Sequence, residues 1–206
     1  AQLMLPVVTA CTRADLGWSN LPFYGVITDA IGQPSAALAA SDKRKKTVSK
    51  ITIWGRRSSV NVQSVLWCLE ELGLGYDRID AGFTYGLVNT DEFRQMNPNG
   101  KVPVITDGDS APIFEAGAIL RYLATQYGTA PLWPESPAER SMVDKWAEWA
   151  KLNFASMFIP AVFWPLVRIA PSKRDFAAIG AALKSVEAEL AIADAALAKT
   201  RFLAGN

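Results

Sequence analysis

Apolar residues change their spacing several times along the chain, and these changes predict a succession of strands and helices. ITIW at residues 51–54 is a short run of β-forming residues, and a helical spacing of apolar residues follows after GRRSS. Gly73 supplies a helix stop. A strand around residues 76–80, a loop with Gly82 and Gly86, and a short helix starting near residues 90–92 come next. The pattern predicts a βαβ unit, whose first helix carries Val62, Val65, Leu66, Leu69 and Leu72.

Two further strands and a helix complete this predicted α/β region. KVPVITDG and SAPIFEA each resemble a strand, and the turn Asp107-Gly108-Asp109 between them is a strong hairpin signal. A helix is then predicted over residues 116–127, with Ile119, Leu120 and Leu123 on one face. The order βαβαββα is therefore expected for a domain at residues 50–128.

The remainder of the chain has helical spacing throughout. YGTAPLWPESP is rich in proline and predicts a linker at residues 129–137. Helices are expected from 138 to about 158 and from 175 to 199, separated by a stretch broken by prolines. The last helix needs partner helices because its apolar residues keep a near-heptad spacing. Residues 138–206 are therefore predicted to form an all-α domain, with Ile179, Leu183, Val186, Leu190 and Leu197 on the inner face of its last helix.

Residues 1–49 keep neither a helical nor an alternating period and end in the polar run SDKRKKTVSK. This segment is expected to be a disordered extension. Its basic cluster at residues 43–46 could bind nucleic acid or direct targeting, but a solvated linker is the commoner use of such a cluster. No secretory signal is predicted, because the opening lacks a basic n-region and a clear cleavage site.

Composition narrows the classes of function. The 206 residues are 50% apolar and carry a formal net charge of +1, so no strong field would attract nucleic acid or an anionic membrane. The apolar stretch at residues 154–170 is short and is interrupted by Pro160, Pro165 and Arg168, so no membrane helix is expected. We therefore expect neither nucleic acid nor a membrane as a partner.

Two residue types are scarce, and both absences restrict the chemistry. Only Cys11 and Cys68 occur, without a CxxC pair, which excludes a disulfide framework and a tetrathiolate metal site and fits a reducing cytoplasm. The sequence has no histidine, so histidine-based triads and histidine-dependent zinc sites are excluded. No metal is expected, and catalysis would use hydroxyl, carboxylate, cationic or backbone groups.

The turn GRRSSVN joins the first predicted strand to the first helix. Ser58, Ser59 and Asn61 therefore lie where backbone N–H groups and the helix dipole favour an anion, and a thiolate held there would be stabilised. Serine and asparagine are also ordinary helix N-cap residues, so capping alone is the alternative interpretation.

Two further segments have polar or backbone groups placed to bind a small peptide. A cis proline at 103, in NPNGKVP, would leave the backbone of Val102 free to pair with an extended ligand; a trans proline in a plain turn is the alternative. Glu115, at a helix start in FEA, can bind an ammonium group while the first N–H groups bind a carboxylate. A simple first-turn carboxylate is the alternative for Glu115.

These three segments, in this order, resemble the cytosolic glutathione S-transferase family. The resemblance runs from residue 50 to 206 and also includes LWCLEELGLGYDRID, NPNGKVPV, AILRYL and the LWP linker. Bacterial theta-like or nu-like members are the most similar subgroup. The resemblance implies a thioredoxin-like α/β domain followed by an all-α domain, and a cytoplasmic homodimer with glutathione as co-substrate.

Roles carry over from the resemblance residue by residue. Ser59 matches the thiol-binding hydroxyl, and Asn61 matches the amide that helps to polarise the sulfur in nu-like members. The remaining glutathione contacts fall on Lys101, Val102, Pro103, Glu115 and Ala116. An aromatic electrophile pocket is expected in the all-α domain, although core packing is the more common use of at least half of its candidates, Trp149, Phe154, Phe158 and Trp164.

The implied activity is conjugation of the glutathione thiolate to small electrophiles, as in detoxification. Peroxidase or disulfide-reductase chemistry at the same Ser59, or a non-catalytic binding or regulatory role, are the alternatives. Ala116 departs from the family, which usually has Glu-Ser there, so one hydroxyl donor to the γ-glutamyl carboxylate is missing. Both ends also depart from the family: residues 1–47 resemble an unrelated extension, and the expected final helices are absent, so we expect a truncated all-α domain.

Overall fold

The computed structural model describes residues 50–130 and 132–205. The expectations for residues 1–49, including the extension and its basic cluster, lie outside these residues. The described chain divides into two compact units, residues 50–126 and residues 127–205. The predicted boundaries of the extension, the domains and the linker stay predictions.

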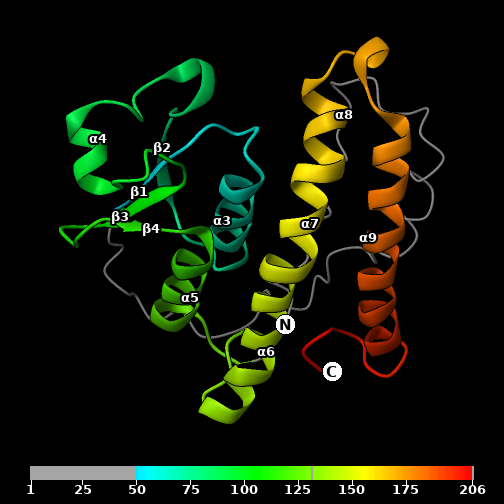
Figure 1. The fold of residues 1–206 in the computed structure, drawn as a ribbon. Coiled ribbons are helices and arrows are strands. Elements are labelled where there is room, and N and C mark those ends of the chain that lie inside the picture. Colours follow the sequence, from blue (N-terminus) through cyan, green and yellow to red (C-terminus); the bar gives the residue numbers. More distant parts are fainter. Residues whose placement is uncertain (1–49, 131, 206) are drawn as a thin grey trace. The chain divides into compact units, whose positions relative to one another are not determined.

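The first unit is built on one mixed four-stranded sheet (Figure 1). Its strands are β1 (Ile51–Trp54), β2 (Tyr76–Ile79), β3 (Val104–Asp107) and β4 (Ile113–Phe114). The strand order is β2-β1-β3-β4, with β1 parallel to β2 and the other two pairs antiparallel. The parallel pair requires a crossover, which the first helix provides.

Figure 1 shows helices on both faces of this sheet. The helices α3 (Val60–Glu71) and α5 (Ala116–Tyr127) lie on one face, and the short α4 (Asp91–Met96) lies on the other. A single 3₁₀ turn, η3 (Phe83–Tyr85), stands between β2 and α4. The predicted order βαβαββα and the thioredoxin-like fold class are confirmed.

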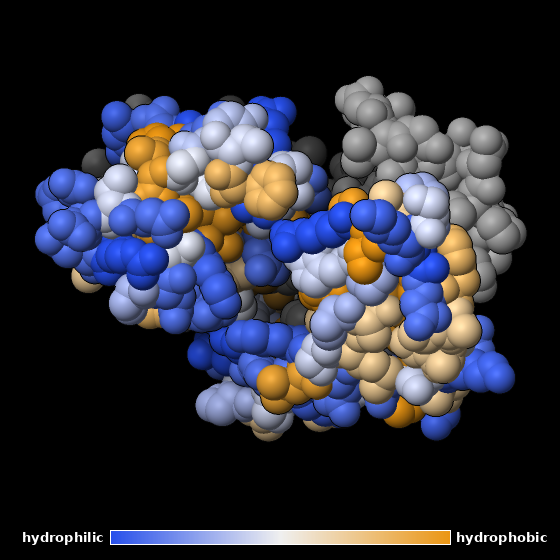
Figure 2. All heavy atoms as spheres, turned by 45° about the horizontal axis from the view of Figure 1, so that its top comes forward, coloured by the Kyte–Doolittle hydropathy of each residue, from blue (hydrophilic) through white to orange (hydrophobic). Residues whose placement is uncertain are grey.

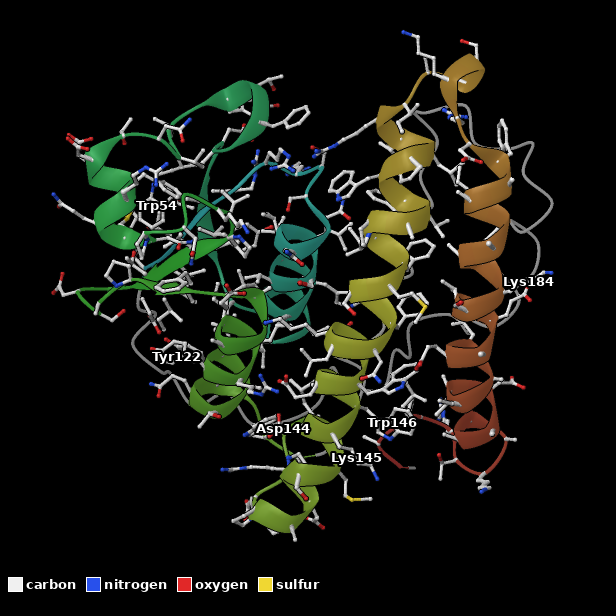
Figure 3. All side chains as sticks on the ribbon, viewed as in Figure 1. Trp54, Tyr122, Asp144, Lys145, Trp146 and Lys184 are labelled. Atoms are coloured by element: carbon white, nitrogen blue, oxygen red, sulfur yellow. The ribbon has the colours of Figure 1, made fainter. Side chains whose placement is uncertain are left out.

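Apolar side chains fix these elements in the expected way. In β1 the alternate residues Ile51 and Ile53 are buried, and Val62, Val65 and Leu69 of α3 are completely covered. Each such side chain contributes on the order of 1.5–3 kcal/mol when buried. Figure 3 shows Trp54 on the α4 side of the sheet, in agreement with its packing against the cluster of Ala81, Phe93 and Val104. Gly73 ends α3 in a left-handed conformation, φ +64°.

The register of the sheet brings four connecting segments to one end of the unit. Trp54 pairs with Ile79 in the parallel direction and with Val104 in the antiparallel direction, and Val104 also pairs with Phe114. The segments that adjoin these residues therefore lie at the same end of the sheet. They are residues 55–59, 80–88, 101–103 and 115–116.

The hairpin between β3 and β4 is longer than the predicted Asp107-Gly108-Asp109 turn. That turn is present, closed by the Ser110 amide donating to the Asp107 carbonyl at 3.1 Å, but β4 begins only at Ile113. Pro112 precedes β4 and has no N–H to donate to the strand ladder, which accounts for the late start of the pairing.

The prediction of a helix interrupted by prolines is wrong for the second unit. One continuous helix runs over Pro137–Arg168, composed of α6 (Pro137–Trp149), α7 (Ser156–Phe158) and α8 (Trp164–Arg168) with two π-helical turns between them. These turns are η4 (Ala150–Ala155) and η5 (Ile159–Phe163). A π turn pairs each N–H with the fifth preceding carbonyl and widens the helix. Pro160, which lacks the N–H and crowds the fourth preceding carbonyl, is accommodated inside η5.

A short 3₁₀ turn, η6 (Pro171–Lys173), leads to α9 (Phe176–Leu197). Asp175 caps α9, since its carboxylate accepts from the Ala178 amide at 2.9 Å. The two long helices share a core of Phe154, Val162, Ile179 and Val186. Trp149 Nε1 donates to Glu189 Oε2 at 3.0 Å and so links α6 to α9. An all-α second unit is confirmed.

The helix Pro137–Arg168 has 32 residues and includes an 18-residue stretch with a mean hydropathy of 1.3, so its length and composition alone would allow it to cross a membrane. Core helices of water-soluble proteins meet the same criterion. Because the prolines do not interrupt this helix, they no longer argue against a span. The expectation of no membrane partner stays a prediction.

Candidate functional site

Ser59 stands at the N-cap position of α3, between the end of β1 and the helix. Its backbone is extended, φ −86° and ψ 122°, as an N-cap requires, yet its hydroxyl makes no capping bond. The residue is buried, with 9% of its surface exposed. Among the residues that the structure describes, the Ser59 hydroxyl has no hydrogen-bond partner, which leaves it available to a ligand at the positive end of α3.

Gln63 fixes the loop that carries Ser59. Its backbone amide donates to the Ser59 carbonyl at 2.9 Å, and its side-chain Nε2 donates to the Arg57 carbonyl at 2.8 Å. Ser64 in the next position donates from Oγ to the Asn61 carbonyl at 2.9 Å. The side chain of Asn61 itself is exposed on the first turn of α3. Two bonds from one residue therefore hold the 57–59 backbone against the helix.

Two residues outside the loop constrain its beginning. A Cβ on Gly55 would lie only 2.4 Å from a methyl of Val62, so the chain passes α3 at a distance that glycine alone permits. Arg78 Nη1 donates to the Gly55 carbonyl at 2.8 Å, and the same guanidinium forms a bidentate pair with Asp80. The hydrogen bond from Arg78 to the Asp80 carboxylate is the main cause of the lowered pKa of Asp80.

The peptide bond between Val102 and Pro103 is cis, as the resemblance implies. The preceding turn is organised by Asn97, which is 3% exposed. Its Nδ2 donates to the Lys101 carbonyl at 2.7 Å and its Oδ1 accepts from the Asn99 amide at 3.1 Å. Lys101 is exposed, and Val102 is partly buried at the end of the sheet described above.

Glu115 lies in the left-handed region, φ +68°, immediately before α5. A non-glycine residue in this region carries backbone strain, and such outliers gather at functional sites. Glu115 is exposed, and its carbonyl accepts from the Ile119 amide at 3.0 Å. Ala116 opens the helix and is partly buried, and its side chain ends at the Cβ to which a serine hydroxyl would be attached.

The structure therefore brings five of the predicted residues to one end of the sheet: Ser59, Val102, Pro103, Glu115 and Ala116. Sequence reasoning missed the residues that hold them there: Gln63, Asn97, Gly55 and Arg78. The asparagine opening NPNG and the glycine directly after ITIW are signals that could have found two of these. Gln63 and Arg78 have no signal in a single sequence.

The four candidates for an electrophile pocket lie along the helix Pro137–Arg168. Phe154 is 7% exposed and belongs to the core shared with α9, and Trp149 and Phe158 pack against that core. Phe154 and Phe158 stack, with ring centroids 5.4 Å apart. Trp164 lies outside this core cluster, with Arg168 3.6 Å above its ring. Trp164 is therefore the candidate least committed to core packing.

Cys68, on α3, is buried away from solvent. Burial, together with the charge of Glu71, raises the pKa of its thiol to about 12. At neutral pH it is a small apolar residue and not a nucleophile. In the described part of the chain, acidic residues and cysteine form no group suited to a metal ion.

Comparison with known proteins identifies the family and the fold. The "Glutathione S-transferase, N-terminal domain" family matches residues 49–125. The chain is 45% identical over 157 residues to Glutathione S-transferase GstB of Escherichia coli strain K12, covering 76% of this chain and 75% of that protein.

Solved structures agree. The chain resembles the glutathione-bound theta class glutathione S-transferase of Xanthomonas axonopodis pv. citri, with a TM-score of 0.71 and 46% identity over 77% of this chain and 75% of that one. It also resembles Ure2p in complex with glutathione, with a TM-score of 0.66 and 29% identity over 76% of this chain and 66% of that one. With this identity over three quarters of a named relative, on a matching fold, the chain belongs to the glutathione S-transferase family.

Proposed function

We propose that the chain is a glutathione transferase, which joins the sulfur of glutathione to small electrophiles. One observation carries the proposal. The Ser59 hydroxyl is at a helix N-terminus but makes no capping hydrogen bond, and it lies at the same end of the sheet as the cis Val102–Pro103 bond. A hydroxyl that served the helix would make the capping bond that Ser59 lacks. Relatives with this fold are named glutathione S-transferases, and two similar structures contain glutathione.

The chemistry requires a thiolate. A free thiol has a pKa near 8.5, so only a few per cent is ionised at neutral pH. A hydrogen bond from Ser59 and the positive end of α3 both favour the charged sulfur and lower its pKa. The thiolate then attacks the electrophilic carbon: an S–C bond forms, the leaving group departs with its bonding pair, and the thiol proton passes to solvent.

The binding roles proposed for the other residues follow from their backbone geometry. Val102, held extended before Pro103, offers its N–H and carbonyl to the cysteinyl backbone of glutathione. Glu115 binds the γ-glutamyl ammonium group, and the N–H groups from Ala116 onward bind its carboxylate. Lys101 reaches the glycine carboxylate. Asn61, on the first turn of α3, helps to polarise the sulfur.

The test is the Ser59→Ala variant, with Ser58→Ala as its matched control. Both serines lie in the same loop, but Ser58 is exposed and Ser59 is buried. Loss of one hydrogen bond to a charged group should lower kcat/KM for an aryl halide by roughly 10- to 100-fold in Ser59→Ala. The ultraviolet absorbance of the bound thiolate should fall with it. Unchanged turnover in Ser59→Ala would show that the thiol is bound elsewhere.

A second candidate function rests on Ala116. Without the serine hydroxyl, the γ-glutamyl carboxylate loses one donor, and a protein that kept the fold as a glutathione-binding module without turnover becomes the alternative. Retention on immobilised glutathione without conjugation of any electrophile would support this alternative. Turnover at a rate that depends on Ser59 would exclude it.

We further propose that the protein acts in the cytoplasm as a homodimer. The buried, free Cys68 and the single remaining cysteine fit a reducing compartment. Cell fractionation tests the location: recovery with a cytoplasmic marker is expected, and recovery with the membranes would contradict it.

A further inference from the structure

The loop at residues 82–88, which we call the η3 loop, has an unusual backbone. Four of its residues adopt positive φ: Gly82 at +82°, Phe83 at +57°, Gly86 at +63° and Leu87 at +64°. Glycine takes this region freely, but phenylalanine and leucine do so at a cost in backbone energy. The loop is closed on itself, because the Gly82 and Val88 amides both donate to the Gly86 carbonyl at 2.8 Å.

This backbone turns apolar side chains outward. Phe83 is 70% exposed, and Tyr85 and Leu87 are 54% and 43% exposed. Figure 2, which brings the upper end of Figure 1 forward, shows apolar surface among hydrophilic residues on the face that carries this loop. Strained backbone and an exposed aromatic ring occur together at Phe83, and strain of this kind gathers at ligand sites.

The η3 loop begins inside the proposed glutathione site. A Cβ on Gly82 would lie 3.2 Å from Arg56 Nη1 and 3.5 Å from both methyls of Val102. Gly82 therefore lies between the loop that carries Ser59 and the residue before the cis proline.

Backbone bonds continue this connection. The Arg56 amide donates to the Ala81 carbonyl at 3.1 Å, and the Ser59 amide donates to the Arg56 carbonyl at 3.1 Å. Phe83, the next residue after Gly82, is thus tied through Arg56 to the residue proposed to bind the thiol. Phe83 therefore directly follows a residue that borders that site.

Arg56 also contacts the ring itself. Its Cζ lies 5.4 Å from the centroid of Phe83, within the range of a cation–π interaction. A guanidinium beside the ring restricts the rotamers of Phe83. A restricted, exposed ring is a better stacking surface than a mobile one, because less side-chain entropy is lost when a ligand binds.

We propose that Phe83 determines the specificity of the transferase for aromatic electrophiles, with Arg56 as its positioning residue. A flat aromatic electrophile stacks on the Phe83 ring in an offset or edge-to-face arrangement beside the sulfur. A small alkyl electrophile presents no ring and gains nothing from this contact. The inference rests on the proposed thiolate site at Ser59 and adds the part of the site that selects the second substrate.

The experiment compares two electrophiles on a small set of variants. Chlorodinitrobenzene is the aromatic probe, and iodomethane is the alkyl probe. Phe83→Ala should lower kcat/KM roughly tenfold for chlorodinitrobenzene, mostly through its KM, and change the value for iodomethane by less than about twofold. Phe83→Gly should behave like Phe83→Ala in activity and melt at a higher temperature, because glycine accepts a φ of +57°.

Controls separate stacking from general damage. Phe176→Ala removes a phenylalanine of similar exposure, 61%, from the start of α9 and should leave both rates unchanged. Phe83→Trp should retain activity toward chlorodinitrobenzene, because it keeps a ring. Arg56→Met should raise the KM for chlorodinitrobenzene without changing kcat for iodomethane.

Equal loss of both activities in Phe83→Ala, or no loss of either, overturns the proposal. These outcomes differ from failure of the proposed function, in which Ser59→Ala leaves turnover of both probes intact. If Ser59→Ala removes both activities while Phe83→Ala affects neither, the thiolate site stands and the specificity assignment is wrong.

Discussion

The γ-glutamyl end of the proposed glutathione site depends on residue 116, where alanine stands in place of the usual serine and its hydroxyl. Ala116 begins α5 directly after the strained Glu115, so its side chain starts from a fixed backbone position. Ala116→Ser should restore one hydrogen bond to a carboxylate and lower the KM for glutathione by roughly tenfold. Steady-state kinetics at varied glutathione measure this change.

Gly117→Ser is the control for Ala116→Ser, since it adds the same hydroxyl one residue later on the same helix. An unchanged KM in Ala116→Ser would mean that the carboxylate is bound by the backbone N–H groups alone. In that case the departure from the family pattern at this position has no effect on affinity.

Cys68 should be inert in the native protein, although it lies on the same helix as the proposed thiol site. With a pKa of about 12, raised first by burial and then by Glu71, its thiolate fraction at pH 8 is on the order of one in ten thousand. In a Cys11→Ser background, the native protein should not react with Ellman's reagent, and denaturation in guanidinium chloride should release one thiol. Rapid labelling of the native protein would contradict the burial of Cys68.

Residue by residue, the sequence indicates which groups are chemical candidates but not what each one does in the fold. A serine between a strand and a helix has the same signature whether it caps the helix or awaits a ligand, and only the absent capping bond of Ser59 separates the two. Asn97 illustrates the opposite case. Its side-chain hydrogen bonds to the backbone of Asn99 and Lys101 depend on the conformation of the turn around it, which a single sequence does not describe.

At the scale of elements, the β1–α3 connection depends on the close approach of Gly55 to Val62. Gly55→Ala would place a Cβ 2.4 Å from a Val62 methyl, so α3 or the 55–59 loop must shift. We expect a loss of about 1–3 kcal/mol in unfolding free energy, as for other overpacked sites, and a fall in kcat because Ser59 moves. Urea denaturation and turnover measure the two effects.

The partner variant makes this prediction specific. Val62→Ala removes the opposing methyls, so the Gly55→Ala/Val62→Ala double variant should lose less stability than the two single changes combined. Gly75→Ala is the matched control, because a Cβ there meets nothing within 4 Å. Strict additivity of the two changes would show that the close approach does not constrain the loop.

Elements were predicted well where periodicity and punctuation agree, and poorly where they conflict. Gly73 ends α3 as expected, and α5 has the predicted bounds. In the second unit, Pro160 and Pro165 argued for a break, but apolar residues on the core-facing side, such as Phe154 and Val162, hold the helix through both. Packing against α9 outweighs the local effect of the prolines, and the π turns absorb it.

For the whole molecule, the fold was predictable because independent motifs had to occur in a fixed order. The thiol turn, the NPNGKVP turn and the FEA helix start are each ambiguous alone. Strand register brings them to one end of the sheet, and register follows from hydrophobic alternation together with the crossover helix. The electrophile side had no comparable constraint. The aromatic residues of the helix Pro137–Arg168 pack largely in the core. Phe83 is not predictable from the sequence, because a single aromatic residue in a glycine-containing loop matches no motif.

Both units leave large apolar side chains exposed, among them Trp67 in the first unit and Leu152 and Ile192 in the second. Exposed apolar side chains of this size are commonly covered by a partner subunit. If the chain is a homodimer, light scattering should give twice the 22.4 kDa chain mass. An apolar interface should persist at high salt, because screening weakens charge pairs but not hydrophobic contacts. A dimer that dissociates in salt would indicate a charged interface, and a monomer mass at micromolar concentration in both buffers would contradict the homodimer.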